Sequence, residues 1–125
     1  METYTLVRPE HLNHYGQLFG GQMLKWVDEF AWLVAAQEYP ACRLVTRAMD
    51  RVEFKTAVDS GSILRFRVEP ARVGQTSVAY RVRVYARKPH AVDDVHVFET
   101  QVTFVCVTDC GCKRTLPACR RDDRA

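Results

Sequence analysis

The sequence predicts an α+β domain in which one long helix packs against a sheet of antiparallel strands. The helix is predicted over residues 19–38, where apolar residues recur at helical spacing and no proline interrupts them. Most of the chain after residue 41 instead alternates apolar and polar residues, which is the period of a β-strand. The 125 residues are enough for one domain. We assign residues 1–117 to it and expect residues 118–125 to form a frayed tail.

Composition narrows the class of protein. Hydrophobic residues make up 47% of the chain and charged residues 26%, which is typical of globular proteins and excludes disordered and collagen-like chains. No apolar run approaches the ~20 residues that a membrane helix needs. The first four residues, METY, lack the basic start and apolar stretch of a signal peptide. We therefore expect a cytoplasmic protein without a membrane partner.

The N-terminal part leads into the helix. Residues 3–8 alternate as a short strand does, and residues 9–18 contain the Pro, Asn and Gly of a loop. The helix is apolar on nearly every side, so we expect it to be buried rather than to lie on a surface. Tyr39-Pro40 ends it, because proline disfavours helix at the preceding residue.

Four further strands are predicted at 42–49, 62–72, 76–87 and 95–107. Gly74-Gln75 indicates a hairpin turn, and residues 88–94 connect the last two strands. A sheet wrapped around the helix is the simplest way to bury it. The basic residues of the strands, such as Arg81 and Arg83, then point outward.

Charge is unevenly distributed, although the net charge is only +3. The first sixty residues carry six Lys and Arg against eight Asp and Glu, whereas the remainder carries twelve against seven. A basic second half fits a phosphate or nucleic-acid partner, and it equally fits a solvated strand face. Both interpretations stay open at this point.

Five cysteines, an odd number, argue against a disulfide framework. Cys110, Cys112 and Cys119 could offer three thiolates to zinc, but the spacing is not C-x2-C and no histidine is near in sequence. We therefore predict no metal site.

The junction between the loop and the helix, residues 13–22, is the densest candidate site. Gly20-Gly21 at a helix start lets a ligand approach the backbone closely, and the unpaired N–H groups there suit an anion or a developing oxyanion. The alternative is that the two glycines only make room for packing.

Asp28 lies two turns into the predicted helix. Its helical neighbours Leu24, Ala31 and Trp32 are all apolar. A buried carboxylate has a raised pKa and can act as a general base. The alternative is a surface ion pair with Lys25, and the pattern alone does not choose between the two.

The string N-x-x-G-x-L-F-G-G at residues 13–21, followed seven residues later by Asp28, resembles the hotdog-fold acyl-CoA thioesterases. The resemblance is strongest to the group that includes bacterial YciA and the brain-type acyl-CoA hydrolase. It covers about residues 5–117 and includes a second strand that begins at Val45-Thr46 and leads to Phe54.

This resemblance implies a hotdog fold, an antiparallel sheet wrapped around one long central helix, with active sites between the protomers of a dimer. Dimers of the family often assemble further, into tetramers or into hexamers built as trimers of dimers. The implied reaction is hydrolysis of acyl-CoA to free acid and CoA. Asp28 matches the general base or nucleophile, Asn13 the asparagine from the other protomer, and the Gly20 and Gly21 amides the oxyanion site.

The same resemblance implies that CoA is bound by two segments, with Gly74, Thr76 and Ser77 in one and Arg87 and Lys88 in the other. No cofactor is implied, since the CoA moiety is part of the substrate. The chain departs from the family pattern at Asp50-Arg51 and at Thr56-Ala57, where a proline is common.

Three other functions are alternatives to hydrolysis. A non-catalytic acyl-CoA-binding hotdog protein, acting as a sensor, is the main alternative, although a pure binder needs neither Asn13 nor Asp28. A dehydratase needs a histidine at the helix start, which His11 and His14 do not provide. A nucleic-acid-binding module is disfavoured because few aromatic residues accompany the arginines. The acyl group and the oligomer beyond a dimer are not predicted.

Overall fold

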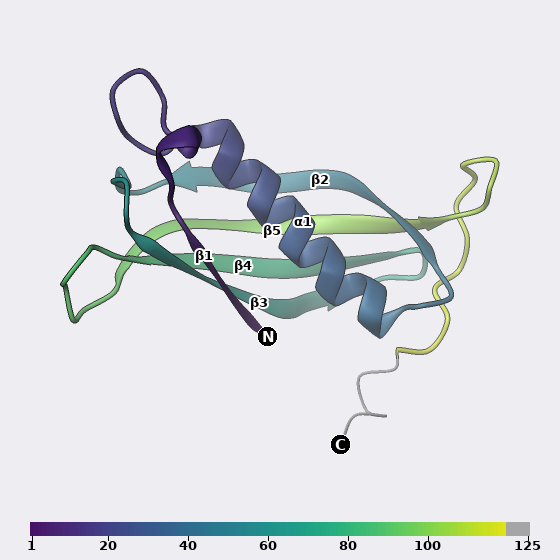
Figure 1. Ribbon diagram of the computed structural model, residues 1–125. Helices are drawn as coiled ribbons and strands as arrows, with labels where there is room; N and C mark the ends of the chain where they lie inside the picture. Colours follow the sequence, from purple (N-terminus) through teal and green to yellow (C-terminus); the bar gives the residue numbers. More distant parts are fainter. Residues whose placement is uncertain (120–125) are drawn as a thin grey trace.

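The computed structural model describes residues 1–119, which form one helix packed across a five-stranded sheet (Figure 1). The sheet order is β1-β3-β4-β5-β2, and every neighbouring pair is antiparallel. The predicted fold class is therefore confirmed. The elements are β1 Glu2–Leu6, a 3-10 turn Pro9–His11, α1 Gly20–Glu38, β2 Arg43–Phe54, β3 Ile63–Val73, β4 Ser77–Arg87 and β5 Val95–Val107.

The strand after the helix is longer than alternation alone predicted, and it reaches Phe54, as the family resemblance implied. We predicted 42–49, whereas β2 continues to Phe54 and pairs with β5 along its length. The register shifts between Asp50 and Glu53, and Arg51 has a φ of 61°. Such a bulge breaks the alternation of side chains on which the prediction depended. The other predicted elements end within two residues of the observed bounds.

The core lies between α1 and the sheet. Met23, Val27 and Ala31 on the inner face of the helix are almost completely buried. The sheet covers them with large side chains such as Phe66 and Phe98, which come from β3 and β5. Burial of this apolar face stabilises the helix, which has no side-chain hydrogen bond at its N-cap.

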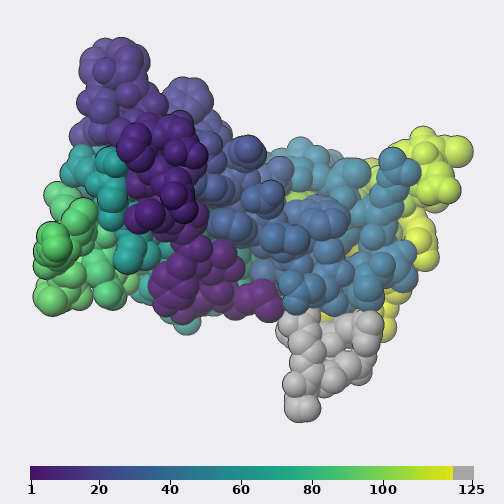
Figure 2. Space-filling model, viewed as in Figure 1, coloured from purple at the N-terminus to yellow at the C-terminus, as the bar shows by residue number. Residues whose placement is uncertain are grey.

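The expectation of a helix buried on all sides is wrong for the single chain. Trp32 and Leu33 are 40% and 45% exposed, because one sheet covers only one face of a helix. Figure 2 shows α1, in blue, at the surface. Val45 and Phe54 of β2 are exposed as well, and in the described part of the chain β2 has a strand neighbour on one side only. Helix and edge strand together expose an apolar surface.

The basic residues of β3 and β4 point away from the helix, as predicted, and they have acidic neighbours. The ion pairs are Arg65–Glu2, Arg65–Asp94, Arg67–Glu69, Arg81–Glu99, Arg83–Glu99 and Arg87–Asp94. These pairs favour the solvated-face interpretation over a nucleic-acid surface, since the arginines are already partnered.

The chain after β5 closes one end of the sheet. Its backbone is tied to Cys106 through Arg114 and to Gln75 through Leu116. Cys119 is half-buried against the core, whereas residues 120–125 of the predicted tail lie outside the described residues. No helix within residues 1–119 has the length and apolarity to cross a bilayer.

Candidate functional site

Two backbone amides at the start of α1 have no hydrogen-bond acceptor among the described residues. The carbonyl of Phe19 accepts from the N–H groups of Gln22 and Met23, at 3.0 and 3.2 Å. No acceptor faces the N–H groups of Gly20 and Gly21, the first two residues of the helix. These amides lie at the positive end of the helix dipole, so they can bind an anion or an oxyanion.

Close packing around the two glycines explains why side chains are absent there. A Cβ on Gly21 would lie 2.6 Å from the ring of Phe19, and one on Gly20 would lie 3.3 Å from the ring of Phe54. Packing and ligand access were alternatives in the sequence analysis. Both favour residues without side chains at this junction.

Asn13 is held by its own loop. Its Oδ1 accepts hydrogen bonds from the N–H groups of Tyr15 and Gln17, at 2.9 and 3.2 Å. The loop is closed by a 2.7 Å bond from the Asn13 N–H to the Gln17 carbonyl. Because its oxygen is occupied, Asn13 can offer its Nδ2 amide as a donor to a ligand.

Asp28 is half-buried and does not lie among apolar side chains alone, contrary to expectation. Its Oδ1 accepts a 2.6 Å hydrogen bond from the hydroxyl of Thr46, on β2. The alternative of an ion pair is not observed either, since no salt bridge joins Asp28 to Lys25. The carboxylate is thus oriented by a neutral donor and keeps one oxygen for other contacts.

Thr46 is a functional candidate that residue-by-residue reasoning missed. It appeared only as part of a predicted strand, and nothing in its sequence context distinguishes it from other strand threonines. The contact arises because β2 runs back along α1, which brings residues 18 positions apart together.

The carboxylate and the helix-start amides lie far apart within one chain. Gly20 and Asp28 are separated by eight residues of continuous helix, a rise of about 12 Å. Asn13 is at the Gly20 end, since its loop is joined to the helix start by the 2.9 Å bond from Phe19 N–H to the His11 carbonyl. One reacting atom therefore does not contact both groups of the same protomer.

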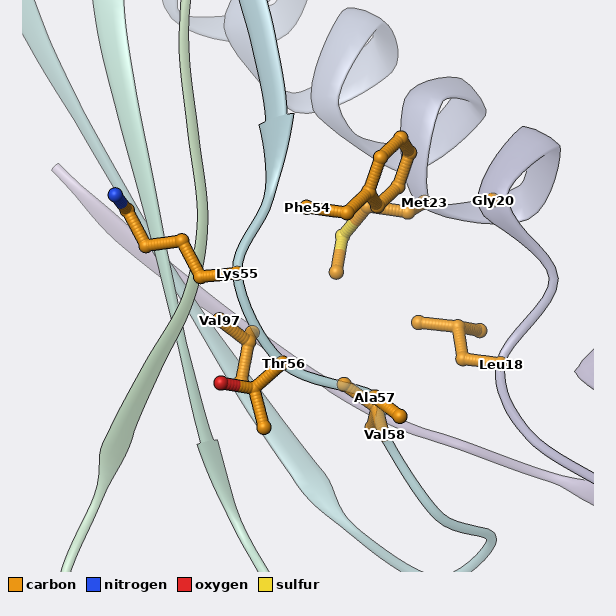
Figure 3. Close-up of a pocket in the computed structure, with 9 residues that line it drawn as sticks. All are labelled: Leu18, Gly20, Met23, Phe54, Lys55, Thr56, Ala57, Val58 and Val97. Carbon is orange, nitrogen blue, oxygen red and sulfur yellow. The ribbon is translucent and has the colours of Figure 1, made fainter.

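A cavity of about 350 Å³ lies beside the helix start (Figure 3). Its wall combines the start of α1 with the extended segment that follows β2. That segment is held by bonds from Lys55 N–H to the Val97 carbonyl, at 2.9 Å, and from Leu18 N–H to the Val58 carbonyl, at 2.8 Å. The lining residues are Leu18, Gly20, Met23, Phe54, Lys55, Thr56, Ala57, Val58 and Val97.

The predicted CoA-binding residues form two separate groups. Gly74, Thr76 and Ser77 lie at the turn before β4, whereas Arg87 and Lys88 lie at its far end. Ser77 and Arg87 are the first and last of the eleven residues of β4, so the two groups lie roughly 30 Å apart. Lys88 is near the cavity end of the sheet, because it lines a small pocket together with Thr56, Ala57 and Val58. Within one protomer the structure does not bring the two groups together.

The cysteines are all free thiols in the described part of the chain, and no three His, Cys, Asp or Glu side chains gather there as a metal site would require. Cys110 and Cys112 are exposed on the turn after β5. Burial and a hydrogen bond with Cys106 raise the pKa of the Cys42 thiol to about 12. Cys42 is therefore an unreactive thiol at neutral pH.

Comparison with known proteins relates this chain to thioesterases. A family model described as the thioesterase superfamily matches residues 15–93. Acyl-coenzyme A thioesterase 11 of Mus musculus is 31% identical over 100 residues, which is 80% of this chain and 17% of the mouse protein. An uncharacterized acyl-CoA thioester hydrolase of Zymomonas mobilis is 30% identical over 104 residues, 83% of this chain and 69% of that protein. The chain thus spans less than a fifth of the mouse relative.

Solved structures agree with the fold. A hexameric hotdog fold thioesterase of Campylobacter jejuni is 30% identical with a TM-score of 0.82, covering 92% of this chain and 88% of that one. A hexameric thioesterase of Yersinia pestis is 26% identical with a TM-score of 0.84, covering 93% of each chain. The predicted hotdog fold is confirmed.

Proposed function

The chain belongs to the thioesterase superfamily, and from that premise we propose that it hydrolyses acyl-CoA to a carboxylic acid and coenzyme A. The observation that carries the proposal is the pair of unpartnered amides at Gly20 and Gly21, which open beside an apolar cavity. A helix start of this kind is suited to the oxyanion that forms when a thioester carbonyl is attacked.

Asp28 is the proposed general base. It takes a proton from water, whose oxygen attacks the thioester carbon, and the carbonyl oxygen becomes an oxyanion held by the Gly20 and Gly21 amides. When the intermediate collapses, the C–S bond breaks and the thiolate of CoA receives the proton from Asp28. The products are the acid and CoA, and no oxidant, metal or cofactor enters the balance. Thr46 orients the carboxylate through its 2.6 Å hydrogen bond.

We propose that each site combines two protomers. The ~12 Å rise between Gly20 and Asp28 supports this arrangement, because the carboxylate and the helix-start amides of one chain are too far apart to contact the same thioester. The exposed apolar surface of Trp32, Leu33 and Val45, next to the unpaired edge of β2, supports pairing of two copies there. Asp28 of one protomer then works with the partner's Asn13 and the partner's helix-start amides.

The hexameric relatives support further assembly into a trimer of dimers. An assembly of this kind also offers a way to combine the two CoA-binding groups, since Arg87 and Lys88 of one protomer can then meet the Gly74–Ser77 turn of another. Lys88 is the clearest candidate for a phosphate contact, because Arg87 is already paired with Asp94 at 3.1 Å.

The first test is CoA release from a panel of acyl-CoAs, from acetyl to palmitoyl with an aromatic ester added. We expect activity in the wild type and a loss of about 10²-fold or more in Asp28→Asn. Glu29→Gln is the matched control, since Glu29 is exposed and adjacent on the helix. If no ester is hydrolysed while acyl-CoAs still raise the melting temperature, the protein is a non-catalytic acyl-CoA binder.

Mixing two inactive variants tests the shared site. In a heterodimer of Asn13→Ala and Asp28→Asn, one of the two sites regains both intact groups if they come from different protomers. Unfolding and refolding an equal mixture is expected to restore about a quarter of wild-type activity, the statistical share of such sites. A site contained within one chain predicts no recovery.

A further inference from the structure

We propose that the cavity beside the helix start holds the acyl chain and restricts the enzyme to medium-length acyl-CoAs, an inference that rests on the proposed thioesterase function. The cavity and the oxyanion site share Gly20, which lines the cavity and also carries one of the two unpartnered amides. A thioester carbonyl held at these amides lies at the mouth of the cavity, and of its two substituents the alkyl chain is the one that the apolar lining suits.

The walls suit an alkyl chain. Leu18, Met23, Phe54 and Val58 present apolar side chains to the same space (Figure 3). Met23 is 1% exposed, and its thioether extends from the helix into the cavity beneath the ring of Phe54. This ring is itself fixed by its contact with the ring of Phe98, at 4.9 Å between centroids. An apolar lining of this kind stabilises the methylene groups that it removes from water.

The size of the cavity limits the chain. An alkyl carbon takes roughly the 30 Å³ that a water molecule occupies in the liquid. A cavity of about 350 Å³ then has room for on the order of ten carbons. Hexanoyl to decanoyl groups fit, whereas the end of a palmitoyl chain has to remain outside or displace a wall.

Two of the walls can be changed in opposite directions. Met23→Ala removes three heavy atoms from the inner wall and lengthens the cavity. Ala57→Leu adds three carbons to the segment after β2, where Ala57 is exposed and the added bulk does not disturb the core. Val34→Ala is the control, because Val34 is buried on the same helix but does not line the cavity.

The measurement is kcat/KM across straight-chain acyl-CoAs from acetyl to palmitoyl. We expect a wild-type optimum between hexanoyl and decanoyl. The ratio of dodecanoyl to hexanoyl activity should rise about tenfold in Met23→Ala and fall about tenfold in Ala57→Leu, and it should be unchanged in Val34→Ala. An optimum at acetyl or palmitoyl, or three variants with the wild-type profile, overturns the inference.

A binding measurement tests the acyl cavity independently of the proposed hydrolase activity. S-alkyl-CoA thioethers of the same chain lengths are not hydrolysed, so their effect on the melting temperature reports binding alone. If no ester is hydrolysed but Met23→Ala shifts the preferred thioether to a longer chain, the acyl cavity stands and the hydrolase proposal fails. If CoA release occurs and the preferred thioether is the same in every variant, the hydrolase proposal stands and the acyl cavity fails.

Discussion

The hydroxyl of Thr46 donates a 2.6 Å hydrogen bond to Oδ1 of Asp28, which links the edge strand β2 to the middle of α1. Asp28 has no ion pair in the described residues, so this bond is the interaction that orients its carboxylate. A positioning role for Thr46 follows from this geometry and leads to the first prediction.

Thr46→Val is expected to lower kcat by about tenfold with little change in KM, because valine keeps the shape of threonine but removes the donor. Thr46→Ser retains a hydroxyl and should recover most of the loss. The measurement is steady-state hydrolysis of the best acyl-CoA, together with melting temperatures. Equal activity in the valine and serine variants contradicts a role for the hydrogen bond.

Gly21→Ala should separate activity from stability. The new Cβ would lie 2.6 Å from the Phe19 ring, which is exposed and can move aside toward the helix-start amides. Alanine also raises helix propensity by about 1 kcal/mol relative to glycine. The displaced ring and the gained helix propensity oppose each other, so we expect a melting temperature close to that of the wild type, with kcat/KM lowered by about 10- to 100-fold.

Gln22→Ala is the control for that change, since it raises helix propensity one residue later without replacing either glycine. It should keep wild-type activity. A Gly21→Ala enzyme as active as this control indicates that close approach to the amide is not needed.

Tyr80→Phe is expected to destabilise the fold by about 1–3 kcal/mol. The Tyr80 hydroxyl donates a 2.6 Å hydrogen bond to Glu38, whose carboxylate is buried at the end of α1. The variant removes a donor from a buried acid while keeping the ring. Urea unfolding measures the loss of stability, and Tyr85→Phe on the outer face of the sheet, where a similar loss is not expected, is the comparison.

Asp94 is expected to make the free energy of unfolding decrease at acid pH. Burial acts to raise the pKa of this carboxyl, but hydrogen bonds from Arg65 and Arg87 outweigh it and hold the pKa below its ordinary value of 3.8. A lowered pKa in the folded state stabilises the protein above pH 3.8, and the contribution is lost as the pH falls through the folded-state pKa.

Melting temperatures measured from pH 7 downward test this. Asp94→Asn should melt below the wild type at neutral pH, and the gap should close below pH 3.8. Asp93→Asn changes the same charge at an exposed neighbour and should show a much smaller gap. A gap that stays constant down to the lowest pH is inconsistent with the Asp94 network.

Alkylation should distinguish the cysteines. With a pKa of about 12, the Cys42 thiol has a thiolate fraction of about 10⁻⁴ at pH 8. Iodoacetamide is therefore expected to label the exposed Cys110 and Cys112 first and to leave Cys42 unmodified in the folded protein. Mass spectrometry of tryptic peptides measures this, with a urea-unfolded sample as the control in which Cys42 reacts. Labelling of native Cys42 at the rate of Cys110 contradicts the assignment.

The predictability of each strand depended on uninterrupted alternation. Residues 98–104 alternate buried and half-buried side chains, and β5 has the predicted bounds. In β2 the bulge at Arg51 inserts residues that belong to neither face, so the pattern ended early and the strand did not. A bulge of this kind hides the continuation of a strand from local periodicity.

Some residues of the candidate site were likewise predictable from the sequence, and others were not. Gly20, Gly21 and Asp28 were identified because a helix start and a carboxylate among apolar neighbours are visible along the chain. The contact of Thr46 with Asp28 was not, because residues 18 positions apart meet only when β2 packs beside α1. The half-buried state of Asp28 was also missed, since helical neighbours describe one helix and not the sheet beneath it.

The amino-acid sequence thus determines the helix, the strands and the chemical groups at the helix start, since these follow from local periodicity and residue type. The tertiary structure alone decides which face of α1 is covered, that a cavity opens beside Gly20, and that the hydroxyl of Thr46 reaches Asp28. The reason is that burial and distance depend on contacts between segments far apart in the chain, and no local pattern records them.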